Sequence, residues 1–530
     1  MRNLVELICN SAERTPQAEA LVDGDRRLDY ATLRNRVLAA ASGLRARGLT
    51  RGERVGLLLD KRQETVEAIF AIAAAGGVCV PINPLLKPEQ VLHILRDSGA
   101  RGLVSSATRL ALLAAEKPQL GELKEVFLVD QVRNAPATLG QATNVRWSAL
   151  LDHAPRDLSD DGTIDSDLAA ILYTSGSTGM PKGVMLTHHN LLEGAWSVAS
   201  YLGNRPGDRI LSALPLSFDA GLSQLTTAFH AGATVVLLNY ITAHDVVQLC
   251  ERERITGITA VPPLWIQLCG AQWPAAATQH LRYFANTGGR MPRPVLERLR
   301  SLFPQASPFL MYGLTEAFRS TYLDPKEAAN RPDSIGKAVP NARILVVRPD
   351  GSPCAPNEVG GLVHVGAFVT KGYWRDPERT ALRFRPSPER SPCPGMPPET
   401  AVWSGDLVRR DAEGFLYFVG RNDGLIKTSG YRVSPEEVEE AVLSSGLVGE
   451  VVALGLPDET LGQVITLVVA PVPGQAADPE AIFAHCRQKL PPYMVPQSIH
   501  VRDVIPRNPN GKFDRTGLQH EYSNGGKESA

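Results

Sequence analysis

The sequence lacks the features that mark several broad classes of protein. Its 55 lysine and arginine residues nearly balance its 56 aspartate and glutamate residues, so no net charge argues for a nucleic-acid or membrane partner. No apolar run reaches the roughly 18 residues that span a bilayer. The seven cysteines are scattered, without a CxxC pair or a histidine at zinc-ligand spacing. We therefore expect a cytoplasmic protein with reduced thiols and no zinc.

Length and apolar pattern predict an α/β protein with more than one domain. At 530 residues the chain exceeds the usual range of a single domain. Short apolar runs such as "RVGLLLD" and "ATVVLLNY" are followed by helix-length segments and then by further runs, "CVPINP" and "TGITAVPP". This alternation predicts parallel sheets covered by helices.

Two stretches interrupt this pattern. Residues 384–400, "FRPSPERSPCPGMPPET", contain six prolines and predict an exposed insertion loop. The turn-prone "RNDG" around Asp423 lies before a new strand-helix unit and suggests a domain boundary with a pivot. We expect a core at residues 1–421, a small α+β domain at 422–522, and a frayed tail at 523–530.

A glycine-rich loop gives the first chemical signal. The stretch "TSGSTGMPKG" holds three glycines, four hydroxyl side chains and Lys182. Glycines let backbone amides curl around an anion, while hydroxyls and a lysine add donors and positive charge. The loop predicts a polyphosphate site, with an ordinary Gly/Ser turn as the alternative. It is not a P-loop, because Lys182 follows Pro181 and precedes Gly183.

This loop resembles, residue for residue, the phosphate-binding loop of the adenylate-forming superfamily. That superfamily contains acyl-CoA synthetases, luciferases and the adenylation domains of nonribosomal peptide synthetases. Three more of its motifs follow in order: "YGLTE" from Tyr312, "SGD" ending at Asp406 with Arg421 after it, and "NGK" ending at Lys512. In the wording of its sequence segments outside these motifs, such as "SFDAGLSQLTTAF", the chain most resembles acyl-CoA ligases associated with exosortase A systems. It also resembles stand-alone enzymes that load amino acids onto carrier proteins.

The resemblance implies a fold and a reaction. The fold would be a large N-terminal domain of stacked α/β sheets with a β-rich subdomain, followed by a small mobile C-terminal α+β domain. The reaction would activate a carboxylic acid with ATP and Mg²⁺ as an acyl-adenylate and release pyrophosphate. Attack of a carboxylate on the α-phosphate needs charge neutralisation and positioning rather than a covalent intermediate on the protein.

The resemblance also implies which residues bind the nucleotide. Tyr312 would stack on adenine, Asp406 and Arg421 would hold the ribose, and Thr178 and Glu316 would bind magnesium. Lys182, Thr315, Glu316 and Lys512 would be the catalytic residues. The remaining nucleotide-binding residues would be Thr174, Ser175, Gly176, Ser177, Gly179 and Gly288.

In members of this family the small domain rotates between the two half-reactions. Asp423 occupies the hinge position, and an Asp beside a Gly can absorb a large change in backbone angles. Lys512 would bridge the carboxylate and the α-phosphate in the first half-reaction and then leave the site. The segment 427–433, "KTSGYRV", would then help to form the channel for a pantetheine thiol.

The choice of acid turns on Asp219, which follows Phe218 where the acyl pocket would begin. In amino-acid adenylation domains an Asp here binds the substrate's amino group, for which a carboxylate is the natural counter-ion. We therefore expect an α- or β-amino acid. The alternative is that Asp219 caps the helix predicted at "AGLSQLTTAF".

The other residues of the acyl pocket follow from the same resemblance. They would be Ala220, Ser223, Ala285, Thr287, Met311, Arg319 and Ser320. Arg319 could pair with a second carboxylate of an acidic substrate. We favour a salt bridge within its own loop, because exposed arginines usually pair locally.

The thiol acceptor is expected to be a separate molecule, because only eighteen residues follow Lys512 and none of them carries a carrier-protein motif. We favour the phosphopantetheine arm of a discrete carrier protein over free coenzyme A. For coenzyme A, Arg390, Lys427 and Arg432 are candidates for binding the 3'-phosphate. A conventional acyl-CoA or aryl-CoA synthetase is the second hypothesis, and Asp219 discriminates between the two. A third, an inactive nucleotide-binding relative, is disfavoured because the full set of motif residues is present.

Overall fold

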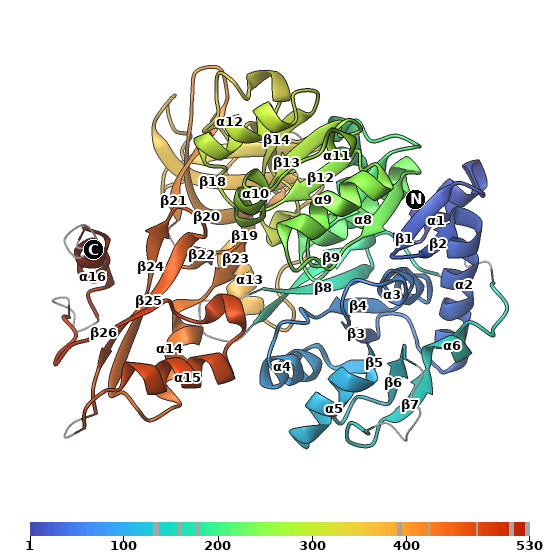
Figure 1. Ribbon diagram of the computed structural model, residues 1–530, viewed down its shortest axis with the longest axis horizontal. Coiled ribbons are helices and arrows are strands. Elements are labelled where there is room, and N and C mark those ends of the chain that lie inside the picture. Colours follow the sequence, from blue (N-terminus) through green and yellow to red (C-terminus); the bar gives the residue numbers. More distant parts are fainter. Residues whose placement is uncertain are drawn as a thin grey trace.

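The computed structural model describes residues 1–130, 137–156, 162–174, 181–389, 395–421, 424–472, 475–507 and 513–524, without the side chains of residues 421, 516 and 524. Within these ranges the strands form two large sheets and two smaller ones, and Figure 1 shows the helices around them. The α/β class and the layered N-terminal part predicted from the sequence are confirmed.

The larger sheet has nine strands in the order β16-β15-β14-β13-β12-β10-β11-β1-β2. The strands from β14 to β1 pair in parallel, and the edges formed by β2, β15 and β16 pair antiparallel. Their bounds are β1 (Glu19–Asp23), β2 (Arg26–Asp29), β10 (Arg209–Ser212), β11 (Thr234–Leu237), β12 (Gly257–Ala260), β13 (Tyr283–Asn286), β14 (Ser307–Tyr312), β15 (Thr321–Leu323) and β16 (Lys337–Ala338).

The second large sheet has seven strands in the order β7-β6-β5-β3-β4-β8-β9. Its strands are β3 (Arg54–Leu58), β4 (Val78–Pro81), β5 (Ala100–Ser105), β6 (Glu125–Leu128), β7 (Thr143–Arg146), β8 (Leu168–Thr174) and β9 (Lys182–Thr187). The strands β8 and β9 are antiparallel, with Thr174 opposite Lys182. The glycine-rich loop therefore joins the ends of two paired strands.

The predicted strand-helix-strand units are present in both large sheets. The strands β3 and β4 flank α3 (Gln63–Ala74) in the chain and pair in parallel. The strands β11 and β12 flank α9 (Ala243–Glu253) and share a sheet, but β10 lies between them. Apolar patterning identifies such strands, whereas their order depends on long-range packing.

The two smaller sheets contain the last strands of the chain. One consists of β17 (Ala342–Val347), β18 (Val359–Gly366), β19 (Phe384–Pro386), β20 (Thr400–Arg410) and β21 (Leu416–Arg421). The other consists of β22 (Ile426–Thr428), β23 (Tyr431–Val433), β24 (Glu450–Asp458), β25 (Gly462–Ala470) and β26 (Ser498–Val501). The proline-rich stretch predicted to be a loop thus begins as the short strand β19, which pairs with β20.

The remaining elements are helices. Those of the N-terminal part are α1 (Glu6–Arg14), α2 (Tyr30–Ala46), α4 (Pro88–Ser98), α5 (Ala107–Ala115), α6 (Trp147–Leu150), α7 (His188–Leu202), α8 (Asp219–Ala231), α10 (Pro262–Cys269), α11 (Ala275–Thr278), α12 (Arg293–Leu302), α13 (Pro377–Arg383), η1 (Thr315–Ala317) and η2 (Pro325–Glu327). Those beside the last sheet are α14 (Pro435–Leu443), α15 (Pro479–Lys489), η3 (Pro492–Met494) and α16 (Arg515–Asn524). Across the described ranges, no helix has both the length and the apolarity that crossing a membrane requires.

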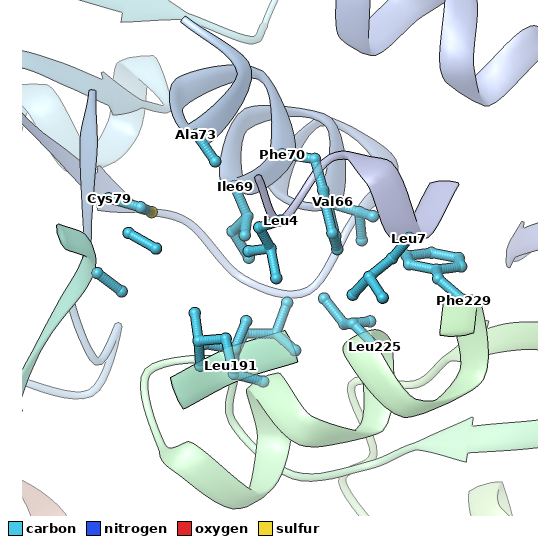
Figure 2. Close-up of a cluster of buried hydrophobic side chains, with 14 of the residues drawn as sticks. Leu4, Leu7, Val66, Ile69, Phe70, Ala73, Cys79, Leu191, Leu225 and Phe229 are labelled. Atoms are coloured by element: carbon cyan, nitrogen blue, oxygen red, sulfur yellow. The ribbon is translucent and has the colours of Figure 1, made fainter. Parts of the chain in front are cut away.

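Helix α3 lies at the centre of the largest apolar cluster. All 12 of its residues are buried, and Figure 2 shows Phe70 of this helix near Leu4, Leu191, Leu225 and Phe229. Residues 68–74 of this helix are all apolar, as burial on every side favours. The polar residues Gln63 and Glu67 in its first half are buried too, and Gln63 Nε2 donates to Glu67 Oε1 at 2.7 Å. This rigid core holds the ends of β3 and β4, where the cleft described below begins.

Candidate active site

A cleft of about 420 Å³ opens where the parallel strands of both large sheets end. Its walls include residues that directly follow strands, such as Leu59 after β3, Ile82 after β4 and Thr287 after β13. Ligands of open α/β sheets bind at the carboxyl ends of the strands. The hairpin of β22 and β23 contributes Lys427, Tyr431 and Arg432 to the lining of the same cleft.

Ten of the residues predicted from the sequence line this cleft together, namely Thr174, Phe218, Asp219, Ala220, Thr287, Gly288, Thr315, Arg319, Lys427 and Arg432. Gly288 has a φ of +75°, and a Cβ there would lie 2.9 Å from Val261. A side chain would therefore be strained and would collide with the cleft wall.

Lys182 and Glu316 meet next to Thr315, and a tyrosine joins them. Lys182 Nζ lies 3.7 Å from Glu316 Oε1 and donates to Tyr373 Oη at 3.0 Å. The Tyr373 hydroxyl in turn donates to Glu316 Oε1 at 2.7 Å. On the other side, Arg432 Nη1 lies 3.8 Å from Glu316 Oε2. Four charged or polar groups from distant parts of the chain thus share one buried position.

The surrounding charges keep Glu316 ionised. Burial would raise the pKa of its carboxyl group, but Lys182, Arg432 and Arg383 lower that pKa to about 2. Its Oε2 atom is buried and accepts no hydrogen bond from the described residues. Within these residues, no group of three or more acidic, His or Cys side chains could hold a metal alone. One carboxylate fits Mg²⁺, which proteins often bind through one or two carboxylates plus substrate phosphates.

The residues predicted to hold the nucleoside also lie together. The Tyr312 hydroxyl donates to the Asp406 carboxylate. Asp406 on β20 is directly opposite Arg421 on β21, so the strand register brings the backbones of this acid and base side by side.

Asp219 has a different local role from the predicted alternative. It is the first residue of α8, whose N-cap is Phe218, and no side chain caps the helix. The suggested capping role for Asp219 is therefore wrong. Its Oδ2 instead accepts a hydrogen bond from Arg319 Nη1 at 3.1 Å. The expected salt bridge of Arg319 within its own loop is also wrong, because its partner is on α8, 100 positions earlier in the chain.

The backbone before Arg319 directs this side chain inward. Phe318 has φ +50° and ψ −61°, a region that non-glycine residues rarely adopt and that costs about 1–3 kcal/mol. The residue is fully buried, and its ring packs so closely on Gly194 that a Cβ there would lie 2.3 Å from it. The next residue, Arg319, is 2% exposed.

Behind Arg319 lies a second cavity of about 20 Å³, which is room for about one water molecule. Ala220 and Arg319 line both this inner cavity and the main cleft, so they separate the two. Ser223 and Met311 of the predicted pocket line the inner cavity. The Met311 sulfur accepts from the Tyr201 hydroxyl at 3.1 Å.

Two predicted pocket residues line neither cavity. The Ser320 hydroxyl lies 2.9 Å from His364 Nδ1 in the interior, and Ala285 on β13 is fully buried in the apolar core. Arg319 lines the cleft, whereas its neighbour Ser320 lines neither cavity. The structure therefore does not support contact of Ser320 or Ala285 with a substrate.

Several predicted residues lie outside the described ranges: Ser175, Gly176, Ser177, Thr178, Gly179, Arg390, Asp423 and Lys512. The described neighbours of Lys512, Arg507 and Phe513, do not line the cleft. Arg507 pairs with Glu450 at 2.7 Å instead.

Sequence reasoning missed Tyr373, which links Lys182 to Glu316. Its partners are 191 and 57 positions away, and no motif marks it. It also missed Asn83, Glu437 and Tyr493, which line the cleft from distant parts of the chain. Only the tertiary structure brings these residues to one place.

Comparisons with known proteins match almost the whole chain. The model of the AMP-binding enzyme family matches residues 9–374, and that of the AMP-binding enzyme C-terminal domain matches residues 437–512. The chain is 31% identical to a feruloyl-CoA synthase of an Amycolatopsis species, over 95% of both chains. It is 30% identical to the L-proline:L-prolyl-carrier protein ligase of Pseudomonas fluorescens, over 98% of this chain and 99% of the relative.

The chain is also similar to part of a longer relative and to the whole of a solved structure. The chain is 31% identical to a linear gramicidin synthase of Brevibacillus parabrevis over 96% of its own length, but it spans only 9% of that relative. Among solved structures, the o-succinylbenzoate CoA synthetase of Bacillus subtilis has a TM-score of 0.81 at 27% identity and covers 98% of both chains.

Proposed function

The chain belongs to the AMP-binding enzyme family, and from this premise we propose that it activates an α- or β-amino acid and passes it to the phosphopantetheine thiol of a separate carrier protein. The family activates acids by adenylation, and its ligases include enzymes named for coenzyme A and for carrier proteins. The choice of acid and acceptor is the part that we propose.

In the proposed first half-reaction, a carboxylate oxygen attacks the α-phosphate of ATP and pyrophosphate leaves. Both reactants are anionic, so Lys182 and the amides of the glycine-rich loop neutralise charge on the phosphates. Mg²⁺ held by Glu316 would supply further positive charge there. The Tyr373 hydroxyl holds the Lys182 ammonium and the Glu316 carboxylate next to each other through its two hydrogen bonds. Thr315, Asp406, Arg421 and Lys512 keep the roles that the motifs imply.

The observation that carries the amino-acid proposal is the position of Asp219. Its side chain is 17% exposed, and the residue lines the same cleft as Thr287 and Thr315. Arg319 engages only Oδ2, and no described residue donates to Oδ1. An ammonium group could bind Oδ1 while the bond to Arg319 stays intact, and a partly buried carboxylate is its natural partner.

A conventional acyl-CoA or aryl-CoA synthetase is the second candidate, and the same ion pair favours it. Arg319 already neutralises Asp219, so the pocket can accept an uncharged acyl group without an unpaired charge. A feruloyl-CoA synthase of comparable length is also among the relatives. The two candidates differ in what Asp219 does.

The test is acid-dependent release of pyrophosphate from ATP and Mg²⁺ across α-amino, β-amino, fatty and aryl acids. Wild type is compared with Asp219→Ala and with Asp152→Ala, which removes an exposed aspartate that does not line the cleft. We expect amino acids to give the highest rates and Asp219→Ala to lower kcat/KM about 100-fold, because an ammonium loses a desolvated partner. If fatty or aryl acids give the highest rates of pyrophosphate release and Asp219→Ala remains active with them, the second candidate is correct.

A further inference from the structure

One lysine of the cleft lacks an acidic partner. Lys61 lies between β3 and α3, is partly buried and lines the cleft. Its Nζ atom donates to the backbone carbonyl of Ala213 at 2.9 Å. The carboxylate next to it in the chain, Asp60, is engaged by Arg109, whose Nη2 lies 2.9 Å from both oxygens. Among the described residues, no acidic side chain forms an ion pair with Lys61.

Two hydrogen bonds fix the main chain of this lysine at the cleft. The Lys61 N–H donates to Asn239 Oδ1 at 3.2 Å, and Asn239 Nδ2 donates to the Lys61 carbonyl at 2.7 Å. Asn239 follows β11 and lines the cleft as well. The long stem of a lysine is flexible, so the amine can move within the cleft while its backbone stays in place.

The segment that Lys61 contacts leads directly into the acyl pocket. Residues 213–220 all line the cleft. The chain reverses after Pro215, whose carbonyl accepts from the Phe218 N–H at 3.2 Å. Pro215 is two residues from Ala213, which is at most about 7 Å of extended chain. Lys61 therefore lies beside the turn that carries the first residues of the acyl pocket.

The surroundings of Lys61 favour a neutral amine. Burial lowers the pKa of Lys61 to about 8, and the charge of Asp60 opposes this shift only in part. The bond to Ala213 does not hold the proton, because a neutral amine can donate to a carbonyl oxygen as an ammonium group does. At pH 8 about half of the Lys61 side chains are thus neutral, against less than about 1% of ordinary lysines. A desolvated, neutral lysine is a nucleophile.

The reaction of the family forms an electrophile in the same cleft. An acyl-adenylate is a mixed anhydride of a carboxylic acid and a phosphate, and amines as well as thiols attack its carbonyl carbon. Attack by an amine forms a C–N bond and breaks the C–O bond to the phosphate. AMP leaves with the electron pair of the broken bond, and the nitrogen gives a proton to water. The product is an amide, and no further reactant is needed.

We propose that Lys61 accepts the acyl group of the adenylate when no thiol takes it, so that the protein acylates itself. The step rests on adenylation, which is the reaction of the family, and not on the acid or the acceptor proposed above. Acylation removes the charge of Lys61 and places an acyl chain in the cleft. Self-acylation thus slows the enzyme when the thiol acceptor is scarce.

Mass spectrometry of the wild-type protein tests this proposal. Two reagents are used at pH 8 without thiol: ATP and Mg²⁺ with each acid that releases pyrophosphate, and acetyl adenylate added directly. Peptide mapping then measures the acyl group on each lysine. We expect Lys61 to be acylated at least about tenfold faster than Lys124, because more of its amine is neutral. Lys124 is exposed and does not line the cleft.

Two results of this peptide map would overturn the proposal. The first is equal acylation of Lys61 and Lys124, which would show that the cleft gives Lys61 no advantage. The second is acylation of Lys427, which also lines the cleft, in place of Lys61.

The pH profile distinguishes a neutral, partly buried amine from an ordinary one. The rate of acylation of Lys61 by acetyl adenylate should rise with a midpoint near pH 8 and level off by about pH 9.5. An ordinary lysine would still gain reactivity at that pH. A profile for Lys61 that still rises steeply there would contradict the neutral amine on which the proposal depends.

Lys61→Arg and Lys124→Arg form a matched pair of variants. Arginine keeps the positive charge but stays protonated and is not a nucleophile here. Lys61→Arg should lose most of the acyl label, whereas Lys124→Arg should match wild type. Wild type should lose pyrophosphate release as it becomes labelled, while Lys61→Arg keeps its own starting rate. If label and loss of activity both persist in Lys61→Arg, another residue is the acceptor and the assignment is overturned.

The two reagents separate this inference from the proposed function. Acylation of Lys61 by acetyl adenylate supports the inference even if no amino acid releases pyrophosphate, which would contradict only the proposed function. Release of pyrophosphate with amino acids but without label on Lys61 overturns the inference and leaves the proposed function intact. The map of the wild-type protein decides both cases even if Lys61→Arg folds poorly.

Discussion

At the scale of single residues, the pairing of Asp219 with Arg319 determines the electrostatics of the acyl pocket. Arg319 is almost completely buried, and its Nε atom has no hydrogen-bond partner within the described ranges. A buried guanidinium without its carboxylate would carry an uncompensated charge, which is costly. Asp219 therefore has a structural role in addition to the substrate role proposed for it.

A double-mutant cycle measures that structural role. We expect Arg319→Met to lower the free energy of unfolding by about 2–4 kcal/mol, because Asp219 loses its buried counter-ion. Asp219→Ala should have a similar effect. The double variant should cost clearly less than the sum of the two, since no unpaired charge remains. Urea denaturation measures all four proteins, and strict additivity would show that the two side chains do not interact.

At the scale of elements, the start of α8 is held against the preceding turn by a close backbone contact. A Cβ at Gly221 would lie 2.0 Å from the carbonyl oxygen of Pro215. Pro215 belongs to the segment between β10 and α8, which lines the cleft and leads into Asp219. The contact thus fixes the position of Asp219 through the backbone rather than through its side chain.

Gly221→Ala should separate α8 from this turn. We expect a loss of about 1–3 kcal/mol in the free energy of unfolding, as overpacking in a tight interior costs, together with a raised KM for the acid. Gly121→Ala is the matched control, because no atom lies within 4 Å of its added Cβ. The argument would be contradicted if the two variants had equal melting temperatures and equal KM values.

The contact of α14 with α4 predicts a pH dependence. Burial raises the pKa of Glu437 to about 7 from an ordinary value of 4.5, Gln90 opposes this shift and Glu440 adds to it. Tyr493 and Tyr431 are the other titratable groups beside it. The folded protein therefore binds this proton more tightly than the unfolded chain does. The contribution of Glu437 to stability falls as pH rises from about 4.5 to about 7 and stays low above that.

Comparison with Glu437→Gln isolates this contribution. The free energy of unfolding of wild type, measured relative to the variant, should fall by up to about 3 kcal/mol between pH 4.5 and pH 8. The variant cannot ionise at this position and should lack that component. A difference between the two proteins that is constant over this pH range would contradict the raised pKa.

At the scale of the whole molecule, the C-terminal part presents the β22–β23 hairpin to the cleft. Arg432 of this hairpin lies 3.8 Å from Glu316, whereas α16 lies at the far end of the molecule in Figure 1. The described neighbours of Lys512 are thus away from the cleft in this arrangement. Lys512 itself lies outside the described residues, so its part in adenylation stays a prediction.

Lys512→Ala tests whether two arrangements are used. We expect it to lower the rate of adenylate formation by about 100-fold or more, because a charge aimed at the reacting phosphate is lost. Thioester formation from a preformed adenylate should change less than about threefold. The two half-reactions are measured separately by pyrophosphate release and by consumption of the thiol. Equal losses in both would contradict a mechanism with two arrangements.

The fold class and the order of the motifs could be predicted from the sequence alone. Apolar periodicity reflects local burial, so the pattern predicts β3, α3 and β4 where the structure has them. The glycine-rich loop and the "YGLTE" motif are local in the chain, and their residues Thr174 and Thr315 do line one cleft.

Only the tertiary structure decided the partners of these residues. Arg319 binds Asp219 rather than its own loop, Tyr373 joins Lys182 to Glu316, and Ser320 faces the interior. Each of these outcomes depends on contacts between segments far apart in the chain. A sequence encodes local preference directly, whereas such contacts arise only when sheets and helices pack and the backbone direction at each residue is fixed.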